Sequence, residues 1–328
     1  MDSIGAPVYW IGFLAFVAVM LALDLGVFHR KSHRVSMREA ATWSVVWVSM
    51  AGLFALLVWR WFGSERALEF TAGYLIEKSL SVDNLFVFVL VFSALAIPPA
   101  LQHRVLFWGI LGALAFRAGF ILAGGALLAK FHWLIYVFGA LLLLSGVKML
   151  MSKEHGPADL SKSRALRWFR KLVPTTDTLE GDRFWVRRAG RLMATPLLAA
   201  LVLIEASDIV FAVDSVPAIF AVSQDPFIVF TSNIFAIMGL RSMYFLLAGV
   251  LDKFAYLKHG LAAILVFIGG KMMLLDVYKI PIPVSLGTVA AILLVSIGVS
   301  LWLAPRPVHG ADADPPTPTP APAPAPAP

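Results

Sequence analysis

The chain contains no cysteine among its 328 residues, and it is poor in charge, with Asp, Glu, Lys and Arg together at 14%. The absence of cysteine excludes disulfide bonds, thiolate metal sites, iron–sulfur ligation and cysteine nucleophiles. A soluble domain carries roughly 25% charged residues, whereas 59% of this chain is hydrophobic. The composition therefore indicates a protein that lies in a lipid bilayer, with any metal held by oxygen or nitrogen.

Long apolar segments make up most of the chain. A bilayer core about 30 Å thick needs roughly 20 apolar residues in a helix that rises about 1.5 Å per residue. Nine segments are close to that length: 8–28, 40–62, 70–95, 104–129, 132–151, 196–222, 226–250, 259–276 and 283–303. We therefore expect an all-α polytopic membrane protein with about nine transmembrane helices. The first segment follows an acidic start and lacks a small-x-small cleavage site, so we interpret it as a retained helix.

Basic residues in the connections predict the orientation. Residues 29–38 hold four Lys or Arg and residues 152–195 hold ten, and connections rich in positive charge stay in the cytoplasm. Threading nine spans from these connections places the N-terminus outside and the C-terminus in the cytoplasm. The net charge of +7 is explained by the connections, so no nucleic-acid partner is expected.

Two parts of the chain resemble each other at an offset close to 124 residues. SVDNLFVF at 81–88 resembles ASDIVFAV at 206–213, and FRAGFILAG at 116–124 resembles LRSMYFLLAG at 240–249. Each copy holds three spans, so two inverted three-helix repeats are predicted; a duplication retained for packing alone is the alternative. The predicted organisation is two N-terminal helices (1–69), a first repeat (70–151), a basic cytoplasmic connection (152–195), an inverted second repeat (196–276), a ninth helix (277–304) and a disordered Pro/Ala-rich tail (305–328).

Five carboxylates lie inside the third and sixth apolar spans: Glu77, Asp83, Glu205, Asp208 and Asp214. A charged residue at the centre of a membrane helix costs roughly 2.5–3.5 kcal/mol. Lys78 is the one basic residue within these two spans, so a bound cation or bound protons must offset the remaining charge. We therefore predict a cation site, and a structural network of protonated acids and hydroxyls is the alternative.

The spacing in the sixth span predicts an irregular site. Asp208 and Asp214 are six residues apart and so differ by about 120° around an ideal helix. Pro217 lacks an amide hydrogen and clashes with the carbonyl of Val213, so we expect the helix to open beside Asp214 and free backbone carbonyls. Secondary ligands or gates are predicted at other polar positions of the spans: Ser81, Asn84, Ser207, Ser215, Arg117 and Arg241. For the two arginines the alternative is that they snorkel to the membrane surface or satisfy backbone carbonyls.

The types of ligand favour a hard divalent cation. The two acidic spans offer carboxylates, an amide, hydroxyls and backbone carbonyls, with neither cysteine nor histidine. Mn²⁺, Mg²⁺ and Ca²⁺ suit such oxygen donors, whereas zinc and copper prefer softer ligands. The sequence therefore predicts a divalent metal ion as the cargo.

Four strings carry a resemblance to a known family: EKSLSVDNLFVF, FAVDSVPAIFAV, DPFIVFTSNIFAIMGLRSMYFLL and FIGGKMML. They resemble the TerC family of bacterial integral membrane proteins, most closely its Alx-like branch, over nearly the whole chain except the tail. The resemblance implies a bacterial inner membrane. The resemblance implies a plan similar to the LysE-type exporter superfamily, and an association with manganese export, protection from metal excess, alkaline-pH response and tellurite resistance. It also places the family's intramembrane acids at the five carboxylates named above.

Three functions follow as hypotheses. The first is export of Mn²⁺ by alternating access of the inverted repeats, with protons that compete for the carboxylates as counter-ion. The second is metal handling or assembly, in which the protein metallates or docks with other membrane or exported proteins through 152–195. The RALRWFRKL string of that connection equally fits anionic lipid. The third, an intramembrane aspartyl protease using Asp83 and Asp214, lacks a Gly-x-Gly-Asp motif, so no enzyme activity is expected.

Overall fold

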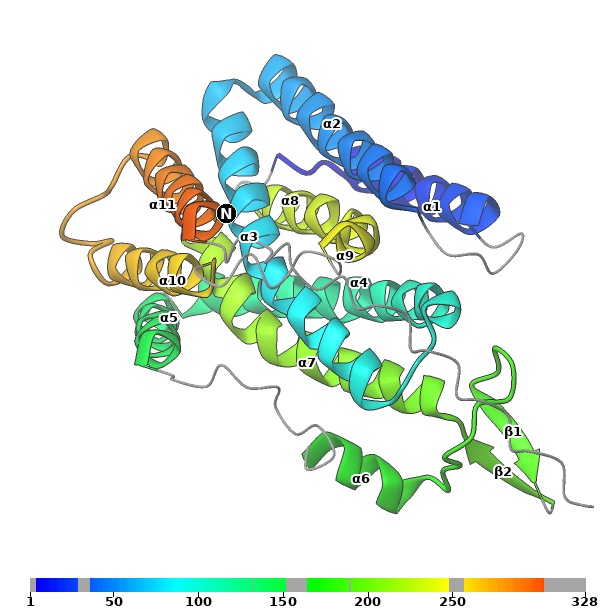
Figure 1. Cartoon of the computed structure of the whole chain (residues 1–328). Helices are drawn as coiled ribbons and strands as arrows, with labels where there is room; N and C mark the ends of the chain where they lie inside the picture. Colours follow the sequence, from blue (N-terminus) through cyan, green and yellow to red (C-terminus); the bar gives the residue numbers. More distant parts are fainter. Residues whose placement is uncertain are drawn as a thin grey trace, which may run out of the picture.

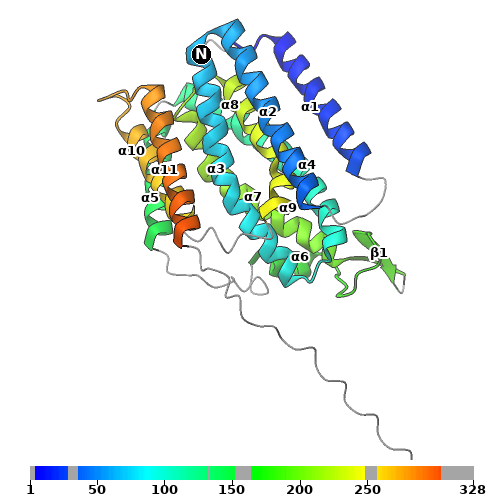
Figure 2. The same ribbon diagram turned by 45° about the horizontal axis from the view of Figure 1, so that its top comes forward.

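A computed structural model describes residues 4–28, 36–131, 133–151, 164–188, 190–247 and 257–303. These residues form a helical bundle with one short helix and one β-hairpin at an end (Figures 1 and 2). The elements are α1 (Pro7–Phe28), α2 (Met37–Phe62), α3 (Ser64–Ala94), α4 (Pro99–Lys130), α5 (Leu134–Met151), α6 (Arg164–Leu172), β1 (Trp185–Arg188), β2 (Arg191–Ala194), α7 (Pro196–Phe220), α8 (Pro226–Met238), α9 (Leu240–Leu247), α10 (Leu257–Met273) and α11 (Ile282–Leu303).

The helices agree with the expected spans. Within the described ranges, six helical stretches are long and apolar enough to cross a membrane, and two shorter apolar helices, Pro7–Leu23 and His259–Met273, fall in the first and eighth expected segments. The third expected segment is covered by α3, which is 31 residues long but carries several charges. The prediction of an all-α polytopic membrane protein is confirmed. The number of spans and the domain boundaries stay predictions, and the tail lies outside the described residues.

The helix α8 lies at the centre of the bundle. Of an 18-residue stretch within Pro226–Leu246, 94% is buried inside the protein, against 17% for the corresponding stretch of α2. The rings of Phe13 on α1 and Phe54 on α2 lie 5.7 and 5.0 Å from the ring of Phe235 on α8. The helices α1 and α2 therefore form an outer layer that covers α8, as Figure 2 shows at one side of the bundle.

The first helices of the two expected repeats, α3 and α7, pack against each other in opposite directions. Ser223, just after α7, donates a 2.6 Å hydrogen bond to Glu69 near the start of α3. At the other end, Leu95, just after α3, and Pro196, at the start of α7, line one cavity. The helices α4 and α8 also pack together, as do α5 and α10. Antiparallel packing of the leading helices is what an inverted repeat requires, and the duplication itself stays a prediction.

Glycine allows α5 and α10 to approach each other closely. A Cβ atom at Gly146 would lie 2.8 Å from the carbonyl oxygen of Ala262, and one at Gly269 would lie 2.8 Å from the carbonyl oxygen of Gly139. Small residues let membrane helices pack backbone to backbone, where van der Waals contact drives association. Figure 1 shows the two helices side by side at one edge of the bundle.

The interruption of a helix falls at a different place from the one expected. The predicted opening beside Asp214 is wrong, because α7 is continuous through Pro217. This proline lies in the last turn of α7, where few hydrogen bonds of the helix remain to be disturbed. The seventh expected span is interrupted instead at Gly239, between α8 and α9. The Nζ atom of Lys78 lies 3.1 Å from the carbonyl oxygen of Ala236, where a cation satisfies carbonyls exposed at the end of α8.

Candidate metal-binding site

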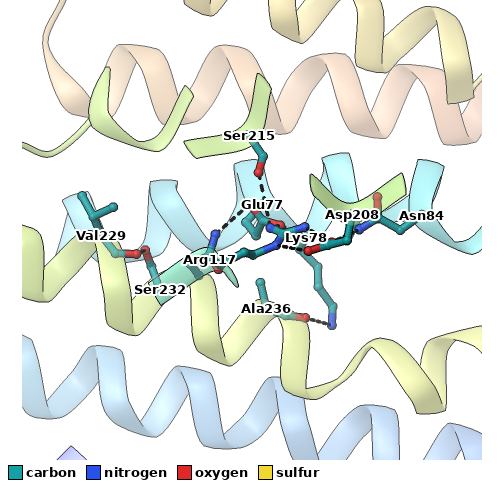
Figure 3. Close-up of polar contacts among 11 residues, drawn as sticks. Glu77, Lys78, Asn84, Arg117, Asp208, Ser215, Val229, Ser232 and Ala236 are labelled. Atoms are coloured by element: carbon teal, nitrogen blue, oxygen red, sulfur yellow. Dashed lines mark hydrogen bonds and ion pairs between the residues drawn. The ribbon is translucent and has the colours of Figure 1, made fainter. Parts of the chain in front are cut away.

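The side chain of Arg117 lies at the centre of a buried polar network. It projects from the middle of α4 and is 1% exposed. Its Nη1 atom donates to Oε1 of Glu77 on α3. Its Nη2 and Nε atoms donate to Oδ1 and Oδ2 of Asp208 on α7, at 2.7 and 3.2 Å. Figure 3 shows the guanidinium between the two carboxylates. The bidentate pair of Arg117 with Asp208 and its second ion pair with Glu77 therefore join α4 to α7 and to α3.

Helical spacing brings further polar groups to the same place. Ser215 follows Asp208 by seven residues, or about two turns of α7, and its Oγ accepts a 3.3 Å hydrogen bond from Arg117. Ser81 follows Glu77 by one turn of α3 and donates to its carboxylate at 3.3 Å. Polar groups on α3 and α7 thus line the inward face of each helix over about two turns.

Two asparagines extend the network. The Nδ2 atom of Asn84 on α3 donates to Asp208 at 3.3 Å, and that of Asn233 on α8 donates to Glu77 at 3.0 Å. Both side chains are buried, at 2% and 0% exposure. Among the described residues, the Oδ1 atom of each has no hydrogen-bond partner. A buried oxygen without a partner costs about 1–3 kcal/mol, so a donor or a cation placed against either oxygen would be stabilising.

Glu205 lies beside the network. It precedes Asp208 by one turn of α7 and interacts with it electrostatically. Its carboxylate lies against Gly112 of α4, where a Cβ atom would overlap it. Within the described part of the chain, its Oε2 atom is buried without a hydrogen-bond partner. Glu205 is therefore a third carboxylate next to the pair that holds Arg117.

The remaining expected ligands lie elsewhere. Asp214 faces α5, where Ser145 donates a 3.0 Å hydrogen bond to it, in keeping with its offset of about 120° from Asp208. Asp83 is half-buried on α3, and the contacts of Arg117 do not include it. The hydroxyl of Ser207 donates to the carbonyl of its own helix at Leu203. Arg241 is buried on α9, and it is not among the residues joined by the hydrogen bonds of Arg117.

The structure thus gathers part of the predicted site around one arginine. We call this set the Arg117 network, and it consists of Glu77, Ser81, Asn84, Arg117, Asp208, Ser215 and Asn233. Within the described ranges, no group of three or more Asp, Glu or His side chains is arranged to hold a metal ion. In this conformation the cation that compensates Glu77 and Asp208 is the guanidinium of Arg117.

Asn233 and Ser145 are the members of these contacts that sequence reasoning missed. The signal for Asn233 is the run of three polar residues, Thr231 to Asn233, inside an apolar stretch. The hydroxyls of Thr231 and Ser232 donate back to carbonyls of α8 itself. Asn233 alone of the three donates its side-chain hydrogen bond across to another helix, which the sequence does not distinguish.

Comparison with known proteins identifies the family. The model described as "Integral membrane protein TerC family" matches residues 62–307. The membrane protein STKORF319 of Myxococcus xanthus is 59% identical over 301 residues, which cover 91% of this chain and 93% of that protein. Alx of Escherichia coli K12, whose name proposes a membrane-bound redox modulator, is 49% identical over 316 residues, which cover 93% and 98%.

No solved structure matches this chain. The family match begins just before α3 and ends just after α11, and it therefore includes every residue of the Arg117 network. The expected resemblance is confirmed, and the chain belongs to the TerC family of integral membrane proteins.

Proposed function

We propose that this chain exports a divalent metal cation, most favourably Mn²⁺, across a bacterial inner membrane. The observation that carries the proposal is the buried pair of carboxylates, Glu77 and Asp208, on two helices that pack in opposite directions. Acidic residues inside a membrane bundle are costly and commonly mark ion pathways. A site shared by oppositely directed helices becomes accessible from each side in turn when the helices rock against each other.

The proposed donor set consists of oxygen atoms. Glu77 and Asp208 are joined in this proposal by Glu205 and by the amide oxygens of Asn84 and Asn233, which have no hydrogen-bond partner in the part of the chain that the structure describes. Carboxylate and amide oxygens suit Mn²⁺, Mg²⁺ and Ca²⁺, and the site contains no thiolate or imidazole that would favour zinc or copper. Asp83 and Asp214, which lie outside the Arg117 network, are proposed as further stations along the path.

Arg117 acts in this proposal as the cation that the metal replaces. Its guanidinium compensates one of the two negative charges of Glu77 and Asp208, whereas a divalent ion compensates both. Arginine keeps its charge in proteins, so Arg117 compensates one carboxylate of the unloaded site while the protein returns for another ion, and a bound proton compensates the other. Protons that bind the carboxylates are the proposed counter-ion. This role makes Arg117 a gate of the site and keeps the cycle free of uncompensated buried charge.

The name of the Alx relatives is compatible with a metal carrier. Because this chain has no cysteine, it cannot carry out thiol–disulfide exchange itself. The protein would then affect the cellular redox state indirectly, by changing the amount of a redox-active metal such as manganese in the cell. Transport is preferred to the alternative of docking and metallating other proteins, because Glu77 and Asp208 are buried inside the bundle, out of reach of a docked protein.

Metal flux in proteoliposomes tests the proposal. Vesicles that contain the purified chain should take up Mn²⁺ faster than protein-free vesicles, as measured with a metal indicator inside the vesicles. Transport of Mg²⁺ and Ca²⁺, and the effect of a pH gradient, are measured in parallel. Glu77→Gln and Asp208→Asn should reduce the flux to that of empty vesicles, because each removes a carboxylate. Asp182→Asn, which breaks an exposed ion pair with Arg104, is the matched control and should keep the flux. Absence of flux of all three ions by the unaltered chain would overturn the proposal.

Replacement of Arg117 tests its role as a gate. Arg117→Gln removes the competing cation, so Mn²⁺ should bind about tenfold more tightly or better, since charged hydrogen bonds contribute roughly 1.5–3 kcal/mol. Flux should nevertheless fall, because the unloaded site then returns with uncompensated carboxylates. The amplitude of the electron paramagnetic resonance signal of free Mn²⁺ measures the binding. Arg104→Gln on the same helix is the control, and weaker Mn²⁺ binding by a folded Arg117→Gln variant would contradict the gate.

A further inference from the structure

The connection between α5 and α7 forms a platform at the end of the bundle where α7 begins. The platform consists of the described residues 164–188 and 190–195, which contain α6 and the hairpin (Figure 1). Leu166 of α6 and Val186 of β1 are each 3% exposed. The hydroxyl of Thr195 donates to the carbonyl of Arg183 at 2.8 Å, and Ala194 exchanges backbone hydrogen bonds with the segment before the hairpin. These hydrogen bonds hold the platform together, and Leu166 packs in one apolar cluster with Leu197 and Ala200 of α7, so the platform is docked on the bundle.

Large apolar side chains of the platform are exposed. They are Trp168 and Leu172, each 70% exposed, Leu192 at 57% and Trp185 at 43%. Trp168 and Leu172 are four residues apart and so lie on one face of α6. Leu192 is opposite Arg187 in the hairpin, two positions from Trp185, so Leu192 and Trp185 lie on one face of the hairpin. Exposed tryptophan beside leucine is typical of segments at the level of membrane head groups.

Basic residues of the platform exceed the acids available to them. The three described acids are already paired: Asp177 with Arg170, Glu180 with Arg188, and Asp182 with Arg104 of α4. Four exposed basic residues lie farther than ion-pair distance from every acid in the described part of the chain: Lys171, Arg183, Arg187 and Arg191. Lys171 and Arg191 directly precede the exposed leucines at 172 and 192. Positive charge and apolar surface thus alternate on the same elements.

We propose that the platform binds anionic phospholipid head groups of the bilayer that holds the bundle. The apolar side chains of α6 and the hairpin insert at the boundary of head groups and acyl chains, and the four basic residues bind phosphates. Lipid is favoured over an acidic protein because the platform directly precedes α7, so it lies at the surface of the membrane. Juxtamembrane basic residues are attracted to anionic leaflets, each by about fivefold in binding. This proposal is independent of metal transport.

The absence of cysteine permits a clean test. Leu172→Cys, labelled with an environment-sensitive fluorophore, is reconstituted as the full chain in phosphatidylcholine vesicles with and without phosphatidylglycerol. With the anionic lipid, the emission should shift to the blue and resist quenching by aqueous iodide, and high salt should reverse both effects. Lys171→Gln and Arg191→Gln should each lower the ratio of protected to unprotected label by about fivefold.

A matched label identifies the other outcomes. Thr178→Cys, exposed on the platform between α6 and β1, should stay in water with either lipid. Equal emission of the Leu172→Cys label in both kinds of vesicle would overturn the proposal. Protection of that label in native membranes but not in anionic vesicles would assign the surface to a protein partner and also overturn it.

Discussion

At the scale of single residues, Arg117 accounts for the presence of Glu77 and Asp208 inside an apolar bundle. A buried ion pair contributes little net stability compared with apolar residues, because the desolvation of two charges offsets their attraction. The loss of one partner is different, because it leaves the other charge buried and uncompensated. The network is therefore sensitive to substitutions that remove one charge.

Asp208→Asn should destabilise the protein much more than Asp214→Asn. Asp208 holds Arg117 through two hydrogen bonds, and breaking a buried pair costs about 3–5 kcal/mol. Asp214 accepts a hydrogen bond from the neutral Ser145, so its neutral variant should melt close to the unaltered chain. Thermal unfolding in one detergent measures the difference. Asp182→Asn is the surface control at about 0–1 kcal/mol, and equal melting of the two membrane variants would refute the assignment.

The composition of the site could be predicted from the sequence, but its arrangement could not. The cost of burying charge in lipid is enough to single out the five intramembrane carboxylates, among them Glu77 and Asp208. Which acids meet depends on how each helix is rotated and packed, and this rotation turned Asp214 towards α5. The hydrogen bond from Asn233 to Glu77 was not predicted, because the side chain of a polar residue in an apolar helix bonds to its own backbone as readily as to a neighbouring helix.

At the scale of helices and strands, apolar length predicted where helices occur, and tertiary contacts decided where one is interrupted. A proline is visible in the sequence, yet α7 continues through Pro217 to Phe220. The interruption at Gly239 has a local cause in the low helix propensity of glycine. Lys78 from α3 contributes a second cause, because its ammonium group donates to the carbonyl oxygen of Ala236 at the end of α8 and stabilises that end. That second cause joins residues 158 positions apart and is not readable from the segment itself.

Gly269→Ala should weaken the contact of α10 with α5, whereas Gly270→Ala should not. A Cβ atom at Gly269 would lie 2.8 Å from backbone atoms of Gly139 and Leu143, while one at Gly270 meets nothing within 4 Å. Overpacking costs about 1–3 kcal/mol. Gly270→Ala has no such cost and gains up to about 1 kcal/mol from the higher helix propensity of alanine. The melting temperature should therefore fall for Gly269→Ala and rise for Gly270→Ala. A change in the same direction for both variants would show that the close approach of α5 and α10 does not govern stability.

At the scale of the whole molecule, the antiparallel packing of α3 and α7 combines with the positive charge of the platform to predict the orientation in the membrane. The platform holds most of the basic residues of the connection 152–195, and positive connections remain in the cytoplasm. The helix α7 crosses from the platform to the turn before α8, which contains Ser223 and Asp225 and lies beside the start of α3. That turn should therefore face the outside.

Single cysteines at the two ends of α7 should be labelled from opposite sides. Thr178 and Gln224 are both exposed, and the parent chain has no cysteine to give a background signal. A membrane-impermeant maleimide added to intact cells should label Gln224→Cys, because the turn faces outwards, and should label Thr178→Cys after the inner membrane is permeabilised. The unaltered chain is the control in both conditions. Labelling of Thr178→Cys in intact cells, with Gln224→Cys protected, would reverse the orientation, and export would then have to be reconsidered as uptake.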